Sequence, residues 1–236
     1  MPLVSSNMQM SEVVEAHTSL IPVLNRLGIR LGLGDRTVAD ICTEHQLDTD
    51  FLLTVLNTFL NEEYFPERKL RTFHLSQIID YLTKTNRYYE RYQLPNIERH
   101  LRSFLSMSGG NPSLALIGRF FESFKETFLR RIGKDDGEWF PYCLELSRRL
   151  ATNPDVDAEK GFSLPSPENA EDQIEALLAD MKSIMIKHLS GEYNDNLCYA
   201  VIFAISSLEK DVKQHNRIRY RILLPMVAAM ESLCRP

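Results

Sequence analysis

Apolar residues recur every three or four positions along most of this chain, which is the spacing of one helix face. No segment shows the sustained alternation of apolar and polar residues that marks a half-buried strand. One stripe illustrates the helical spacing: Leu114, Ile117, Phe120, Phe121, Phe124 and Phe128. The pattern predicts an all-α protein, with stripes of this kind forming its core.

Short helices are expected near the N-terminus. Residues 19–29 predict a helix that Gly28 closes, and Thr37 is a natural N-cap for the next helix. A third helix starts after Asp48 or Thr49, and its buried stripe is Leu52, Leu53, Leu56, Phe59 and Leu60. Two short helices joined by a tight turn form a helix-turn-helix-like unit.

Longer helices follow a polar, proline-containing linker at residues 62–72. From residue 75 onward the periodic runs lengthen, and a loop rich in Pro, Asn and Asp interrupts them at residues 152–167. Long amphipathic helices with short links predict an antiparallel four-helix bundle. We therefore expect a helix-turn-helix-like domain at residues 1–66 and a bundle at residues 73–236.

Two of the long helices share a pattern around an internal proline. A polar residue stands ten positions before the proline, another follows four positions later, and an apolar residue precedes the proline directly. The matching residues are Arg131, Asp135, Phe140 and Pro141 in one helix, and His215, Arg219, Leu224 and Pro225 in the other. Proline inside a helix costs about 3 kcal/mol and frees a carbonyl. Two prolines at matched offsets therefore suggest a duplicated helix pair.

Composition narrows the class of protein. The 236 residues are 44% hydrophobic and 25% charged, as is usual for a globular protein. The net charge is −5, so the overall electrostatic potential of the protein does not attract nucleic acid or anionic lipid. The N-terminal residues lack the pattern of a signal peptide, and no apolar run reaches the length of a membrane span. Four scattered cysteines without a CxxC pair argue against a zinc ribbon or a disulfide framework. We expect a reduced, cytoplasmic setting without membrane contact.

Four segments resemble one family. They are GLGDRTVADICTEHQLDTDFLLTVLNTFL, DYLTKTNRYYERYQLP, RRIGKDDGEWFP and HNRIRYRILLP. Together they resemble the hemerythrin-like di-iron proteins of the "repair of iron centres" or "regulator of cell morphogenesis and nitric oxide signalling" type. The resemblance implies a small N-terminal helical domain before a four-helix bundle. It also implies a role in the stress response and in iron–sulfur cluster repair.

In this chain most iron ligands of that family are replaced. The resemblance places the ligand positions at Asn86 or Arg87, Arg131, Asp135, Glu171, His215 and Arg219. Guanidinium cannot ligate a metal, so we expect a degenerate site without a cofactor. We also expect Arg131 and Arg219 to point inward and pair with Asp135 and Glu171, with His215 hydrogen-bonded among them. A bundle that binds one metal, such as iron, through His215, Asp135 and Glu171 is a third interpretation.

Function is predicted to be non-enzymatic, because the chain carries no recognisable nucleophile, phosphate-binding or zinc-protease motif. We favour a protein partner and leave self-association open. The alternative is a transcriptional regulator that binds DNA through the N-terminal domain. Against it, the segment DTDFLLTVLNTFLNEE contains no Lys or Arg and four acidic residues. Candidate phosphate contacts outside that segment are Arg26, Arg30, Arg36, Arg68, Lys69 and Arg71.

Overall fold

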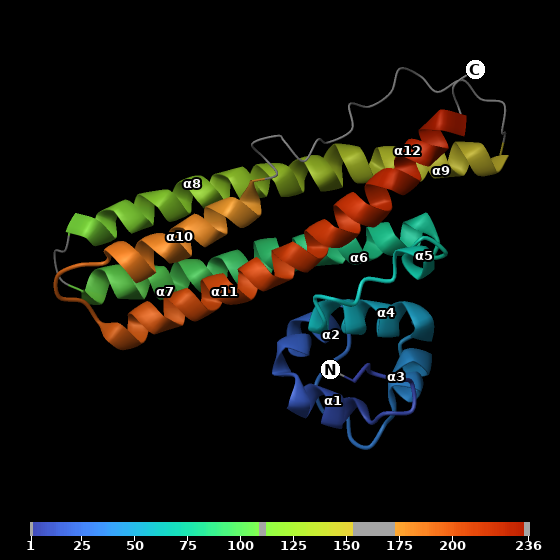
Figure 1. Ribbon diagram of the computed structural model, residues 1–236, viewed down its shortest axis with the longest axis horizontal. Helices are drawn as coiled ribbons and strands as arrows, with labels where there is room; N and C mark the ends of the chain where they lie inside the picture. Colours follow the sequence, from blue (N-terminus) through green and yellow to red (C-terminus); the bar gives the residue numbers. More distant parts are fainter. Residues whose placement is uncertain (1, 109–111, 153–172, 234–236) are drawn as a thin grey trace.

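The structure, a computed structural model, describes residues 2–108, 112–152 and 173–233 (Figure 1). It is all-α, as the spacing of apolar residues predicts. Within the described ranges there is no strand, only an isolated antiparallel bridge between Gln9 and Thr37. None of the described helices is both long and apolar enough to cross a lipid bilayer.

The N-terminal unit, residues 2–70, consists of short helices. These are α1 (Met10–Ala16), the 3-10 turn η1 (Thr18–Leu20), α2 (Ile21–Arg26), α3 (Val38–Glu44), α4 (Thr49–Leu60) and α5 (Glu67–Leu70). The helix expected over residues 19–29 is thus split between η1 and α2. Sequence analysis did not predict α1, and α5 lies within the expected linker.

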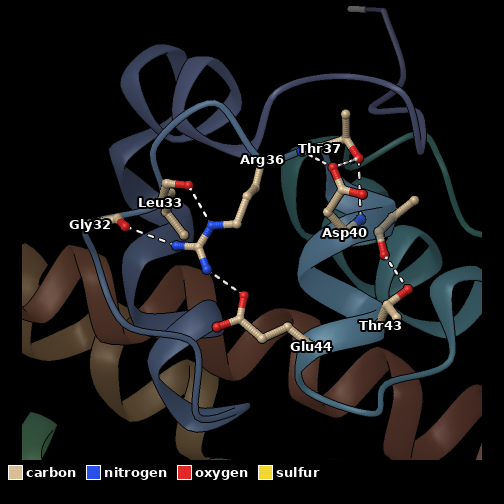
Figure 2. Close-up of polar contacts among 8 residues, drawn as sticks. Gly32, Leu33, Arg36, Thr37, Asp40, Thr43 and Glu44 are labelled. Carbon is tan, nitrogen blue, oxygen red and sulfur yellow. Dashed lines mark hydrogen bonds and ion pairs between the residues drawn. The ribbon is translucent and has the colours of Figure 1, made fainter.

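Side-chain caps define where α3 and α4 begin. Thr37 caps α3 as predicted: its hydroxyl accepts the backbone N–H of Asp40 at 3.2 Å. The Asp40 carboxylate in turn accepts the backbone N–H of Thr37 at 2.9 Å (Figure 2). At the start of α4, the Asp48 carboxylate accepts the N–H of Phe51 at 2.8 Å, so Asp48 is the cap and Thr49 is the first helical residue. These bonds satisfy backbone donors that a helix start leaves free.

The long helices of residues 75–233 pack side by side, and we call them the bundle (Figure 1). Its first run joins α6 (Leu75–Tyr88), the π turn η2 (Tyr89–Gln93) and α7 (Leu94–Met107). The second joins α8 (Pro112–Lys134), the π turn η3 (Asp135–Trp139) and α9 (Phe140–Thr152). Next comes α10 (Ile174–His188). The last run joins α11 (Asp195–Ile218), the π turn η5 (Arg219–Leu223) and α12 (Leu224–Leu233). Helix α7 packs on α8 and α11, and α10 packs on the same two helices.

Each π turn directly precedes an apolar residue followed by proline. The backbone N–H groups of Leu94, Phe140 and Leu224 donate to the carbonyl five residues earlier rather than four. The next residue is Pro95, Pro141 or Pro225, which has no N–H and would clash with an α-helical carbonyl. The wider turn accommodates the proline without ending the helix. The proline pattern inferred for two helices is therefore present in three.

Buried polar residues separate two hydrophobic cores inside the bundle. The first core joins the N-terminal unit to α6, α9, η5 and α12, and the second core joins α7, α8, α10 and most of α11. Along each proline-containing run, buried polar side chains stand where one core gives way to the other. We call these residues the polar layer: Arg26, Thr85, Asn86, Arg131, Asp135, Asp211, His215, Asn216 and Arg219. Because the first core crosses residues 66–73, the predicted domain boundary is not a break in apolar packing.

Candidate functional site: a buried ion-pair layer

Equivalent positions of the three proline-containing runs are buried, and all of them except Tyr89 belong to the polar layer. The residues ten positions before the prolines are Thr85, Arg131 and His215, and those six positions before are Tyr89, Asp135 and Arg219. None of these six residues is more than 3% exposed. Helical geometry places residues four apart on one face, so each run contributes a stacked pair to the interior.

The carboxylate of Asp135 lies between two arginines. Nη2 of Arg219 donates to Oδ1 of Asp135 at 2.7 Å, and Nε of Arg131 lies 3.9 Å from Oδ2. The expected inward position of both arginines beside Asp135 is thus confirmed. The Arg219 guanidinium also lies 4.7 Å from the ring centroid of Trp139, a cation–π distance. Glu171, the other expected partner, lies outside the described residues.

Asn216 extends the network to α10. Arg131 donates to Oδ1 of Asn216, and Nδ2 of Asn216 donates to Oε1 of Glu175 at 2.6 Å. The amide therefore links a buried cation to a half-buried carboxylate on a neighbouring helix. Sequence analysis missed Asn216 and Glu175, although Asn216 directly follows His215 and shares the inward side of α11.

His215 lies in this layer but does not join its hydrogen bonds. It is 2% exposed, and within the described part of the chain neither ring nitrogen has a hydrogen-bond partner. The expected hydrogen-bonding role is wrong: among the described residues both ring nitrogens are without a partner, and the ring instead packs against the Tyr89 ring, with 5.8 Å between the centroids. Burial, and then the charges of Arg131 and Arg219, hold the pKa of His215 well below its ordinary value. The ring is therefore neutral.

The two candidates on the first long helix point in different directions. Asn86 is 1% exposed, and its Nδ2 donates to Oδ1 of Asp136 at 3.0 Å. Burial raises the pKa of Asp136, although the Asn86 bond opposes that shift. Arg87 is exposed. Asn86 thus occupies the inward position, and Arg87 contributes nothing to the polar layer.

Arg26 reaches the layer from α2 in the N-terminal unit. Its guanidinium forms two hydrogen bonds with the carboxylate of Asp211 on α11, one of them at 3.0 Å. Nη1 also donates to the Thr85 hydroxyl at 3.2 Å. The inclusion of Arg26 among the DNA contacts is therefore wrong, because its side chain is only 1% exposed. Asp211 was overlooked, although it lies four residues before His215 on the same helix face.

The remaining candidate DNA contacts lie in the N-terminal unit or directly after it, and most are engaged by other groups. Arg36 donates to the carbonyls of Leu33 and Gly32 at 2.8 and 2.9 Å and also pairs with Glu44 (Figure 2). The other ion pairs are Lys69 with Asp50 at 3.2 Å, and Arg71 with Glu67 at 3.8 Å. Arg30 and Arg68 are exposed. Three of the five candidates therefore already have carboxylate partners.

The layer's donor set does not fit a di-iron centre. Such a centre needs several neutral imidazoles and bridging carboxylates that converge on the metals. Of the described ligand positions, one is histidine and one is a carboxylate held by Arg219. No group of three or more His, Cys, Asp or Glu side chains in the described ranges could hold a metal ion.

Comparison with known proteins assigns no family. No protein-family model matches the chain. No curated protein matches it significantly either.

Proposed function

We propose that this chain is a non-enzymatic protein-binding or regulatory protein of the hemerythrin-like type, in which ion pairs replace the di-iron centre. Its bundle is an antiparallel four-helix bundle, and its N-terminal unit is helix-turn-helix-like. The observation that carries the proposal is the buried pair between Arg219 and Asp135, at positions where the resemblance places metal ligands.

Charge balance supports this replacement. Carboxylates buried beside metal ions depend on the positive charge of those ions, and an unpaired buried carboxylate costs several kcal/mol. Here Arg219 and Arg131 supply positive charge to Asp135, and Arg26 supplies it to Asp211. These carboxylates therefore have counter-ions without any metal.

A protein partner fits the N-terminal unit better than DNA does. Helix α4 would be the recognition helix of a helix-turn-helix protein, yet eight of its twelve residues are buried. A recognition helix must place exposed side chains in the major groove. We place the protein in the cytoplasm, in the setting of nitrosative or oxidative stress and iron-centre repair that the resemblance implies.

The test is metal analysis of protein purified from iron-replete cells, together with its visible spectrum. We expect well under one iron per chain and no oxo-to-iron charge-transfer band. The double variant Arg131→His, Arg219→Glu restores ligand types at two positions and removes two cations. It should therefore bind more iron than the wild type. Near-stoichiometric iron with a charge-transfer band in the wild-type protein would refute the proposal.

A further inference from the structure

One side chain of the N-terminal unit is buried in the bundle interior. All three nitrogens of the Arg26 guanidinium donate hydrogen bonds: Nη1 and Nη2 to Asp211, Nη1 also to Thr85, and Nε to the carbonyl of Pro22 at 3.2 Å. The guanidinium carbon also lies 5.1 Å from the centroid of the Tyr88 ring. Arg26 therefore contacts both α6 and α11 while its backbone belongs to α2.

Asp211 is equally enclosed. Its side chain is 4% exposed, and besides the Arg26 bonds its Oδ1 accepts the hydroxyl of Tyr89 at 3.2 Å. Burial, and then the charge of Asp211, raise the pKa of Tyr89 well above its ordinary value, so this hydroxyl remains a donor. Tyr89 alone cannot balance the charge of the carboxylate. Without Arg26, Asp211 would be a buried anion with only a neutral hydroxyl beside it.

Other polar contacts between the N-terminal unit and the bundle are weaker. Lys213 lies 3.5 Å from Glu62, and Nε of Arg221 donates to Glu67 at 2.9 Å, but all four side chains are at least 38% exposed. Exposed ion pairs contribute little to stability, because water and salt screen them.

Apolar contacts in the first core add affinity but little orientation, because they are not directional. Arg217 adds a long hydrogen bond of 3.5 Å to the carbonyl of Tyr64 and lies over the Phe65 ring, but its side chain is only partly buried. The pair between Arg26 and Asp211 is therefore the buried ion pair that orients the unit on the bundle.

We propose that the pair between Arg26 and Asp211 is a latch that holds the N-terminal unit on the bundle. Breaking this one pair releases the unit, while the helices of the second core stay folded. Docking covers α4, which packs against α11 and whose Phe59 ring lies 5.2 Å from the Lys210 amine. Release exposes that covered face. The latch is thus a conformational device that switches α4 between a buried and an accessible state, and it does not depend on the proposed function.

Amide hydrogen exchange of the full chain, followed by mass spectrometry, tests the latch. In Arg26→Met, peptides from α2 and α4 should exchange about 100-fold faster or more, because removing one partner of a buried pair strands the other. Peptides from α10, in the second core, should keep their wild-type rates. Arg30→Met makes the same substitution at an exposed arginine of the same unit and should change neither region.

A second variant separates the pair from general stability. Arg26→Met combined with Asp211→Leu removes both charges, so α2 and α4 should return to within about tenfold of the wild-type rate. If Arg26→Met does not fold, Asp211→Asn provides the single change, since it leaves Arg26 without a counter-ion. Unchanged exchange in α2 and α4 in the single variant would overturn the latch. Equal acceleration in α10 would also overturn it, because that result means global destabilisation.

Discussion

Arg219 stands where a metal ligand is expected, and its contacts show how a guanidinium fills such a position. It bonds the buried carboxylate of Asp135 at 2.7 Å and stacks on Trp139. A metal ion would attract the same carboxylate, but it needs further ligands that Arg219 does not need. At the scale of single residues, the replacement that we propose would therefore change the source of positive charge rather than remove it.

Replacing Arg219 by alanine should destabilise the protein by about 3–5 kcal/mol, because it removes the closest counter-ion of a buried carboxylate. In a domain of this size that loss lowers the melting temperature by about 6–20 °C. Arg221→Ala is the matched control: its side chain is 52% exposed and pairs with Glu67, so it should cost about 1 kcal/mol or less. Thermal unfolding measures both variants, and equal shifts would show that Asp135 does not depend on Arg219.

His215 predicts a pH dependence of stability. Its folded-state pKa lies well below the value of about 6.5 expected for an unfolded histidine. The unfolded state therefore binds more protons below pH ~6.5, and stability falls as the pH is lowered through that value, by up to about 1.4 kcal/mol per pH unit. Urea unfolding between pH 7 and pH 5 measures this slope.

His215→Gln should remove that part of the slope while lowering stability at every pH. His188→Gln changes an exposed histidine and should leave the slope as it is in the wild type. An unchanged slope in His215→Gln would mean that another group causes the acid sensitivity.

At the scale of helices, each π turn accommodates the proline that follows it, so the turn and the proline are structurally coupled. The turn η2 precedes Pro95, and its residue Arg91 is exposed, so deleting Arg91 shortens the turn with little loss of packing. The deletion should then force Pro95 into an α-helical position, which costs about 3 kcal/mol. Pro95→Ala alone should change stability by less than about 1 kcal/mol, because the wide turn already accommodates the proline.

Combining the deletion of Arg91 with Pro95→Ala should recover about 3 kcal/mol relative to the deletion alone. Urea unfolding of the wild type, both single variants and the double variant gives this coupling energy. Additive effects would show that the turn is held by packing and not by the proline.

Part of the polar layer can be predicted from the sequence, because some of its residues lie at fixed spacings along one helix. The resemblance places Arg131, Asp135 and Arg219 inside the bundle, and the four-residue spacing puts Asp135 on the same helix face as Arg131. The proline offset, counted back from Pro95, points to Tyr89, a signal that was present and unused. The pair between Arg26 and Asp211 joins residues 185 positions apart, and no local pattern predicts such a contact.

At the scale of the whole molecule, the polar layer divides the apolar interior into two cores, and this division does not follow the order of the segments in the sequence. The N-terminal unit shares its core with the near ends of the long helices, and the far ends have a core of their own. Periodicity shows which residues are buried, but not which buried residues share a core. That depends on how helices distant in sequence are placed, which periodicity alone does not give.

The affinity of this protein for DNA depends on how charge is distributed over the whole chain. A net charge of −5 opposes approach to a polyanion, and α4 offers no basic face. Of the five solvent-accessible candidates, Arg36, Lys69 and Arg71 already pair with carboxylates, which leaves Arg30 and Arg68.

We therefore expect weak binding to duplex DNA, with log K falling against log salt with a slope of about −2, since each neutralised phosphate contributes about −0.9. Fluorescence anisotropy at several salt concentrations measures both quantities, and Arg30→Ala with Arg68→Ala should flatten the slope further. Nanomolar binding at physiological salt would contradict this expectation. It would require the ion pairs of the N-terminal unit to open on DNA and would favour the transcriptional regulator.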